Sequence, residues 1–388
     1  MAKRIRQDVR KILDHMKKDK DDKDDKSDSL VSVLHSKCGG VPFSNSVTNL
    51  CLALTNNPSR VGNFDTDMYL FPFSNKLVDL RTCTVRDIEK SDGISRHTGY
   101  PFPQYMRDDP EIYKKYAAEV MEYFRSLVTD DEVADYLICN LARSMIGMNP
   151  YEEAIFLTGT GANGKSLFMK FIQCVFGGAD SKEEYGSMAA ELGGEYFCTG
   201  KSSSDQTDTT LMNILNIRFI TTSEPKAGGG KGKWQGEKFK KMTGNDYCTG
   251  RALYSSKNVS RKLMGTIWFS CNNIPEFDGD DGGMQRRIKR IVFPHYFKDD
   301  GKHLPTYKEG INDLAAKLES EKWRDAAILI MLDYYRDFVM GCELGSKKYN
   351  EPKSVSIDTT QMVAKNSSLR DFCKDTIAKS TDRNIKMQ

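Results

Sequence analysis

Residues 159–166 of this chain read Gly-Thr-Gly-Ala-Asn-Gly-Lys-Ser, the residue spacing of a Walker A phosphate loop. The apolar run at 153–158 predicts a short buried strand before the loop, and the run at 167–176 predicts a helix after it. Strand, glycine loop and helix is the order that the motif requires. Glycines let successive backbone N–H groups curl toward a phosphate, and the helix N-terminus adds partial positive charge. The sequence therefore predicts a site for a nucleoside triphosphate.

Each polar residue of the loop has an expected task. Lys165 is expected to reach the β- and γ-phosphates, and the Ser166 hydroxyl to ligate Mg²⁺. The other residues expected to bind the nucleotide, which we take to be ATP, are Gly159, Gly161, Asn163 and Gly164. The similar letters Thr-Gly-Lys-Ser at 199–202 lack both the upstream glycine and the following apolar helix, so they predict a loop.

Composition excludes several classes of protein. A length of 388 residues indicates two or three domains, and 39% hydrophobic with 29% charged residues is typical of globular proteins. The sequence has no apolar run of 18 residues and no apolar signal core after Met1, so we expect neither membrane insertion nor secretion. Ten cysteines without a CxxC pair favour a reducing compartment over a zinc site.

Positive charge is concentrated in one segment. Between Lys226 and Lys262 there are ten basic and two acidic residues, a net charge of +8, whereas the rest of the chain sums to −5. Such a local cationic surface is expected where a protein contacts phosphates.

The order of predicted elements gives an α/β core between two helical regions. Helices are expected from the Asp109-Pro110 cap and over 131–146, apolar strands alternate with helices and loops over 152–300, and an apolar helix is expected over 321–340. The predicted domains are an N-terminal collar-like domain at 1–149, an ATPase core at 150–300 and a C-terminal helical segment at 301–388, which is expected to include the start of a truncated further domain.

Polar residues follow two further apolar strands and precede a third. Glu224 comes just after the strand 217–222, where a carboxylate can bind Mg²⁺ through water and orient the attacking water. Asn272 follows the strand 265–271, where an amide can sense the γ-phosphate. Arg286 and Arg287 precede a strand and can be either a solvated pair or an arginine finger for a neighbouring subunit.

The order of these motifs resembles that of superfamily 3 helicases, above all the motor region of poxvirus-type and phage/plasmid-type helicase–primases. A resemblance to the segment upstream of the motor in that group is carried by Phe73-Ser-Asn-Lys-Leu-Val-Asp-Leu-Arg81. The motifs are GTGANGKS at 159–166, IRFITTSEP at 217–225, FKKMTGNDYCTGRALY at 239–254, IWFSCNNIP at 267–275 and QRRIKRIVF at 285–293. The third is the most diagnostic. Ala162 departs from the family pattern by replacing a glycine.

The resemblance implies a modified AAA+ core that hydrolyses ATP with Mg²⁺. It also implies a homo-hexameric ring that tracks single-stranded DNA 3′ to 5′ in viral, phage or plasmid replication, in the cytoplasm or at a replication site in the host cell. A primase domain or other replication proteins are implied partners. In the family a hairpin contacts the DNA backbone; the residues expected to do so here are Lys240, Arg251 and Lys257, the last near the hairpin tip.

The alternative is a phosphate-loop ATPase that is not a DNA motor, such as a protein-remodelling AAA+ member or a nucleotide kinase. A kinase would need a lid and an acceptor pocket, and a remodeller usually carries an aromatic pore residue where this chain is densely basic. Stimulation of ATP hydrolysis by DNA would separate these functions.

Overall fold

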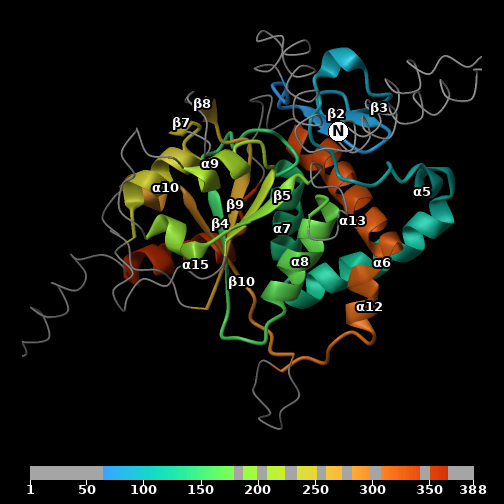
Figure 1. The fold of residues 1–388 in the computed structure, drawn as a ribbon. Coiled ribbons are helices and arrows are strands. Elements are labelled where there is room, and N and C mark those ends of the chain that lie inside the picture. The colour runs from blue at the N-terminus through green and yellow to red at the C-terminus, as the bar shows by residue number, and fades with distance from the viewer. Residues whose placement is uncertain are drawn as a thin grey trace, which may run out of the picture. The chain divides into compact units, whose positions relative to one another are not determined.

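The computed structural model divides the chain into two compact units, Met1–Phe64 and Asp65–Gln388. Almost all of the described residues belong to the second unit, and the description below is confined to it (Figure 1). The described ranges are 64–178, 187–198, 208–222, 234–250, 259–272, 282–297, 307–340 and 350–365.

A parallel five-stranded sheet lies at the centre of this unit. Its strand order is β10-β4-β9-β6-β5, so the chain leaves β4 for the far edge and returns to place β9 and β10 on either side of it. Because the strands are parallel, their carboxyl ends share one edge. The strands are β4 (Ala154–Thr158), β5 (Ala189–Leu192), β6 (Phe219–Thr222), β9 (Thr266–Cys271) and β10 (Ile288–Val292).

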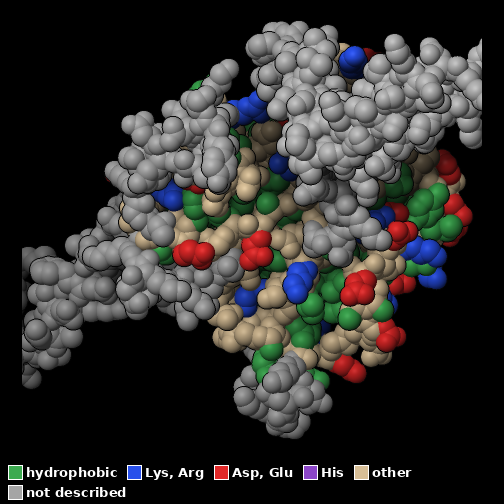
Figure 2. All heavy atoms as spheres, viewed as in Figure 1, with side chains coloured by type: hydrophobic (Ala, Val, Ile, Leu, Met, Phe, Trp, Pro, Cys, Tyr) green, Lys and Arg blue, Asp and Glu red, His purple; other side chains and the backbone are tan. Residues whose placement is uncertain are grey.

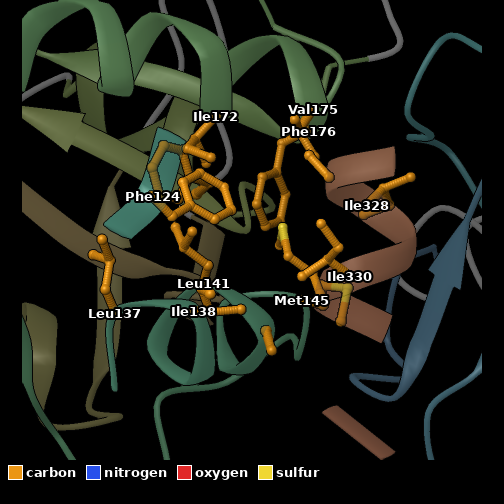
Figure 3. Close-up of a cluster of buried hydrophobic side chains, with 14 of the residues drawn as sticks. Phe124, Leu137, Ile138, Leu141, Met145, Ile172, Val175, Phe176, Ile328 and Ile330 are labelled. Atoms are coloured by element: carbon orange, nitrogen blue, oxygen red, sulfur yellow. The ribbon is translucent and has the colours of Figure 1, made fainter. Parts of the chain in front are cut away.

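Both faces of the sheet are covered, as parallel sheets require. On β4, Ile155 and Leu157 join one apolar cluster, whereas Ala154 and Phe156 join a second cluster on the opposite face. The first cluster packs against α6 (Pro110–Leu127), α7 (Asp131–Arg143), α8 (Lys165–Val175) and α13 (Glu321–Tyr334) (Figures 1 and 3). The second packs against α9 (Thr209–Ile214), α10 (Gly236–Thr243) and α15 (Lys353–Lys365).

The predicted helices around the sheet are present, with local signals that explain their starts. The Asp109 side chain accepts hydrogen bonds from the N–H groups of Glu111 and Ile112, and Pro110 occupies the first position of α6, as predicted. The expected helix over 321–340 is α13 followed by a π-helical turn, Tyr335–Val339. Short helical elements complete the described unit: η1 (Lys90–Asp92), α5 (Gln104–Asp108), η2 (Gly194–Phe197), α11 (Gly282–Gln285) and α12 (Leu314–Glu319).

A small antiparallel sheet precedes these helices, formed by β1 (Leu70–Pro72), β2 (Leu77–Asp79) and β3 (Thr84–Arg86). Arg218, just before β6, anchors it: its Nη1 donates to Met68 O at 2.8 Å and its Nη2 to Leu70 O at 3.2 Å. Burial lowers the pKa of this guanidinium to about 10, so it stays charged at neutral pH.

A two-stranded antiparallel hairpin projects between α10 and β9. It consists of β7 (Tyr247–Gly250) and β8 (Val259–Lys262), with Tyr247 opposite Lys262 and Gly250 opposite Val259. The hairpin implied by the family resemblance is therefore present, and residues 251–258, between its two strands in the sequence, lie outside the described ranges.

The predicted α/β class is confirmed by the parallel sheet and its two helical layers. The division at 149/150 and at 300/301 stays a prediction. Residues 366–388 of the predicted C-terminal segment lie outside the described residues. None of the helices in the described ranges is both long and apolar enough to span a membrane. On the face drawn in Figure 2, basic and acidic side chains are interspersed.

Candidate functional site

The phosphate loop lies at the carboxyl end of β4 and turns directly into α8. Its turn uses left-handed backbone at Gly161 (φ +103°), Ala162 (φ +50°) and Gly164 (φ +80°). A side chain at Gly159 would be 2.7 Å from the carbonyl oxygen of Phe293, so only glycine fits there without a shift. Ala162 is the residue that replaces a glycine of the pattern it resembles, and its left-handed backbone conformation costs about 1–2 kcal/mol.

Lys165 is buried at the first position of α8, and its ammonium meets two side-chain amide oxygens. Its Nζ lies 2.9 Å from Oδ1 of Asn272 and 3.2 Å from Oδ1 of Asn163. Asn272 follows β9, which pairs directly with β4. The structure therefore brings together the lysine and the amide that the sequence assigned to one site from positions 107 residues apart.

A segment that sequence reasoning missed lies against the phosphate loop. After β10, the N–H of Phe297 donates to Ala162 O at 3.0 Å, and Asn163 Nδ2 donates to His295 O at 2.8 Å. Asn163 Oδ1 also accepts from the N–H of Gly161 at 2.6 Å. The Asn163 side chain therefore forms hydrogen bonds both within the phosphate loop and to the segment 293–297. Sequence patterns do not predict these contacts, because the segment makes them through backbone groups.

The start of α8 is suited to a phosphate chain. No side chain caps the helix, and Ser166 is exposed at its second position beside buried Lys165. An uncapped helix N-terminus with a neighbouring ammonium binds anions, and a serine hydroxyl can ligate Mg²⁺. These groups fit a magnesium-bound triphosphate. Glu224, the second predicted Mg²⁺ ligand, lies outside the described residues. Within the described ranges, no cluster of three or more His, Cys, Asp or Glu is arranged around a metal site.

A cavity of about 430 Å³ opens beside the loop. One wall is formed by residues 161–167 with Asn272, and the other is largely apolar. The apolar wall comes from α6, from the segment after β10 and from the region before α13: Tyr123, Leu127, Phe297, Ile311 and Leu314. A polar wall facing an apolar wall is the usual form of a cofactor pocket.

Arg286 and Arg287 lie at the opposite edge of the sheet. Arg287 O accepts from the N–H of Ala154, the first residue of β4, whereas the phosphate loop follows the last residue of that strand. Five residues of strand separate the two sites by about 13 Å. The arginines therefore lie too far away to contact the phosphate loop of the same chain.

The two arginines differ in their surroundings. The Arg287 side chain is 8% exposed and its Nη2 lies 2.7 Å from Oε2 of Glu152, while Nη1 donates to Gly283 O. The Arg286 side chain is 67% exposed, and its Nη2 lies 3.4 Å from the same carboxylate oxygen. The Arg286 side chain is thus exposed to solvent, whereas the Arg287 side chain is buried and bonded to Glu152 and Gly283.

The predicted DNA-binding residues are only partly described. Lys240 lies half-buried near the end of α10, which packs against β7 of the hairpin. Arg251 and Lys257 lie outside the described residues.

Comparisons with known proteins agree with the sequence motifs. Residues 2–122 match the family described as D5 N terminal like. The chain is 28% identical over 344 residues to Putative helicase L207/L206 of Acanthamoeba polyphaga mimivirus, covering 86% of this chain and 33% of that protein. It is 21% identical over 427 residues to Putative helicase 022R of Frog virus 3, covering 92% of this chain and 42% of that protein. The predicted resemblance to viral helicase–primase proteins is therefore confirmed, with the chain spanning a third to two fifths of these relatives.

Among solved structures, the C-terminal region of NrS-1 in its A form apo structure gives a TM-score of 0.37. The identity is 12%, covering 66% of this chain and 51% of that one.

Proposed function

We propose that this chain is the motor region of a viral ATP-dependent DNA helicase of superfamily 3, with a modified AAA+ core. In this proposal it acts as a homo-hexameric ring on single-stranded DNA, moving 3′ to 5′. The observation that carries the proposal is the meeting of Lys165 and Asn272 at the carboxyl edge of the sheet, 2.9 Å apart, beside an uncapped helix N-terminus. In parallel sheets, ligands bind at this edge, where the strand order reverses.

In this proposal each residue of the site has a separate role in ATP hydrolysis. Lys165 would leave its two amide oxygens for the β- and γ-phosphates, which frees Asn272 to bind the γ-phosphate or the attacking water. Bound Mg²⁺ would neutralise the charge of the phosphate oxygens, with Ser166 as a ligand. Glu224 would orient the attacking water and accept its proton.

The position of the arginines supports action between subunits. Because they lie at the far edge of the sheet from their own phosphate loop, an arginine finger from this pair can only serve a neighbour. Of the two, exposed Arg286 is the better finger, and buried Arg287 would orient it through their shared partner Glu152.

The described part of the hairpin supports a contact with nucleic acid. Its outward face carries Tyr247, 63% exposed, with the Lys262 ammonium 5.6 Å from the centre of its ring. Beside them, Thr249 and Ser260 share a hydrogen bond of 2.9 Å. An exposed aromatic ring beside a cation, in a segment with net charge +8, suits stacked bases and a phosphate backbone.

Hydrolysis of ATP with and without single-stranded DNA tests the proposal, together with unwinding of a tailed duplex. We expect DNA to stimulate hydrolysis and Lys165→Ala to abolish it. Lys170→Ala, an exposed lysine on the same helix, is the matched control and should keep activity. Hydrolysis that DNA does not change would favour a protein-remodelling ATPase or a nucleotide kinase.

Mixing two inactive proteins tests the ring and the finger. Lys165→Ala should be inactive alone, because it lacks the cation expected to bind the β- and γ-phosphates. The double variant Arg286→Ala/Arg287→Ala should also be inactive alone, because an arginine finger contributes about 10³-fold or more to the rate. In a mixed ring some interfaces join an intact loop to an intact finger, so ATPase activity should partly return. If proven co-assembly restores nothing, the arginines do not act in trans.

A further inference from the structure

Two asparagine side chains fasten the turn at 244–245, between α10 and β7 of the hairpin, to the turn before β4. Asn245 bonds to both backbone groups of Asn149: its Nδ2 donates to Asn149 O at 2.7 Å, and its Oδ1 accepts from the Asn149 N–H at 3.3 Å. The Asn149 side chain bonds in the same way to Glu153, donating to its O at 2.7 Å and accepting from its N–H at 3.3 Å. An amide that bonds to one residue through both its donor and its acceptor fixes orientation as well as distance.

The turn before β4 carries Glu152, the carboxylate that contacts both arginines. The N–H of Glu152 donates to Asn149 O at 3.0 Å, so this oxygen accepts from Asn245 and from Glu152 together. The Glu152 carboxylate lies 2.7 Å from Arg287 and 3.4 Å from Arg286. Asn149 is 2% exposed, so water does not readily replace these bonds. The position of Asn245 therefore bears on Glu152 through one shared carbonyl oxygen.

The turn at 244–245 also contacts Arg287 directly. The Nη2 of Arg287 would be 3.0 Å from a side-chain carbon placed at Gly244, so the guanidinium packs against the backbone of this turn. Asn245 and Glu152 both have φ +57°, a left-handed conformation that residues with a side chain adopt only where their surroundings enforce it. The bonds of the two asparagines supply that enforcement on both sides of the contact.

We infer that Asn245 is a positioning residue for the arginine pair. From the start of the hairpin it fixes the turn that holds Glu152, and Glu152 fixes the arginines that serve the neighbouring subunit. This inference rests on the proposed action of the arginines between subunits. Only Asp246 separates Asn245 from β7, so the hairpin proposed to contact DNA and the arginines proposed to contact ATP share one anchor.

Asn245→Gly removes both side-chain bonds and keeps the left-handed backbone, which glycine adopts without steric cost. ATP hydrolysis should fall about 10- to 100-fold, the effect of displacing a catalytic group by a small distance. Affinity for ATP should not change, because the phosphate loop lies at the other end of β4. Asn245→Asp keeps the acceptor for the Asn149 N–H and loses the donor, so its activity should lie between those of the parent and Asn245→Gly. Hydrolysis is measured without DNA, so that altered DNA binding by the hairpin cannot produce the result.

Asn75→Ala is the matched control. Asn75 lies between β1 and β2, and its Oδ1 accepts from the N–H of Phe102 at 2.8 Å, so this variant also loses a side-chain bond between separate segments. It should lower the melting temperature and leave ATP hydrolysis unchanged.

Mixed rings show which side of the subunit interface Asn245→Gly impairs. Its own phosphate loop is intact, so Lys165→Ala, which supplies intact arginines, should restore part of the ATPase activity. Arg286→Ala/Arg287→Ala should restore nothing, because neither protein then supplies a well-placed arginine. A defect in the variant's own nucleotide site would give the reverse pattern, so a merely local structural role does not produce the expected one.

Hydrolysis by Asn245→Gly equal to that of the parent, or the reverse pattern of recovery, overturns this inference alone. If Asn245→Gly does not fold or does not enter mixed rings, the same mixtures are made with Asn245→Asp, and the same two results decide. If Lys165→Ala mixed with the arginine double variant restores nothing despite co-assembly, the proposed action in trans fails and this inference fails with it. A parent that hydrolyses no ATP overturns the proposed function itself.

Discussion

Replacing Glu153 by glutamine tests how the strand that carries the phosphate loop is held in place. Glu153 immediately precedes β4 and is 2% exposed, and its Oε2 lies 2.8 Å from Nη1 of Arg143, which is fully buried on α7. Its Oε1 lies 3.6 Å from Lys289 of β10, whose ammonium also contacts Glu351 at 2.6 Å. The carboxylate therefore joins a helix and the neighbouring strand to the base of β4.

The expected cost follows from burial. Removing one partner of a buried ion pair leaves the other charge uncompensated, which costs about 3–5 kcal/mol, whereas replacing both partners by neutral groups is often nearly neutral. Glu153→Gln should therefore lower the free energy of unfolding by about 3–5 kcal/mol. Arg143→Met added to Glu153→Gln should recover at least half of that loss.

Urea denaturation followed by fluorescence measures both values. Glu111→Gln is the matched control, because Glu111 pairs with Lys114 at 2.9 Å and both side chains are at least 70% exposed; its cost should stay below about 0.5 kcal/mol. A loss of less than 1 kcal/mol for Glu153→Gln, or a double variant that is less stable than Glu153→Gln, would refute the reasoning.

Three further predictions concern a turn, the ion pair between Arg86 and Asp92, and the hairpin. Gly177→Ala should cost about 2–5 kcal/mol in urea denaturation, because φ is +78° and the new carbon would lie 2.2 Å from a backbone carbonyl oxygen. The hydrogen bond with Arg86 lowers the pKa of Asp92 below its ordinary 3.8, so its stabilisation is present above that value and lost as pH falls; the melting-temperature gap between parent and Asp92→Asn should close below about pH 4. Tyr247→Ala should weaken single-stranded DNA binding about fivefold or more without changing its salt dependence, whereas Lys262→Ala should reduce the salt dependence, both measured by fluorescence anisotropy.

Local sequence patterns predicted the elements that depend on neighbours along the chain. The Asp109-Pro110 cap, the strand before the phosphate loop and the helix after it all have such signals, and the structure contains them. The observed ends of some helices differ from the predicted ends. The helix expected over 131–146 ends at Arg143, because the N–H groups of Met145 and Ile146 donate to carbonyls three residues back, those of Ala142 and Arg143, which ends the α-helical pattern.

Contacts between distant segments could not be predicted in the same way. The segment at 293–297 contacts the phosphate loop mostly through backbone groups, which any sequence provides. Tyr123 belongs to an apolar stripe on α6 that indicates only a buried face, and whether its hydroxyl finds a partner depends on side chains from other elements.

The contrast between the two arginines also has a backbone cause. Glu152, the carboxylate that both contact, has φ +57°, a left-handed conformation that costs a residue with a side chain about 1–2 kcal/mol. Its N–H donates to Asn149 O at 3.0 Å, and Asn149 in turn donates to Glu153 O at 2.7 Å, so the turn before β4 holds Glu152 in that conformation. Strained residues that persist in this way concentrate at functional sites. In this conformation the Glu152 carboxylate lies 2.7 Å from buried Arg287 and 3.4 Å from exposed Arg286. In the proposed ring, a phosphate bound by the neighbouring subunit would compete for Arg286 with this longer contact.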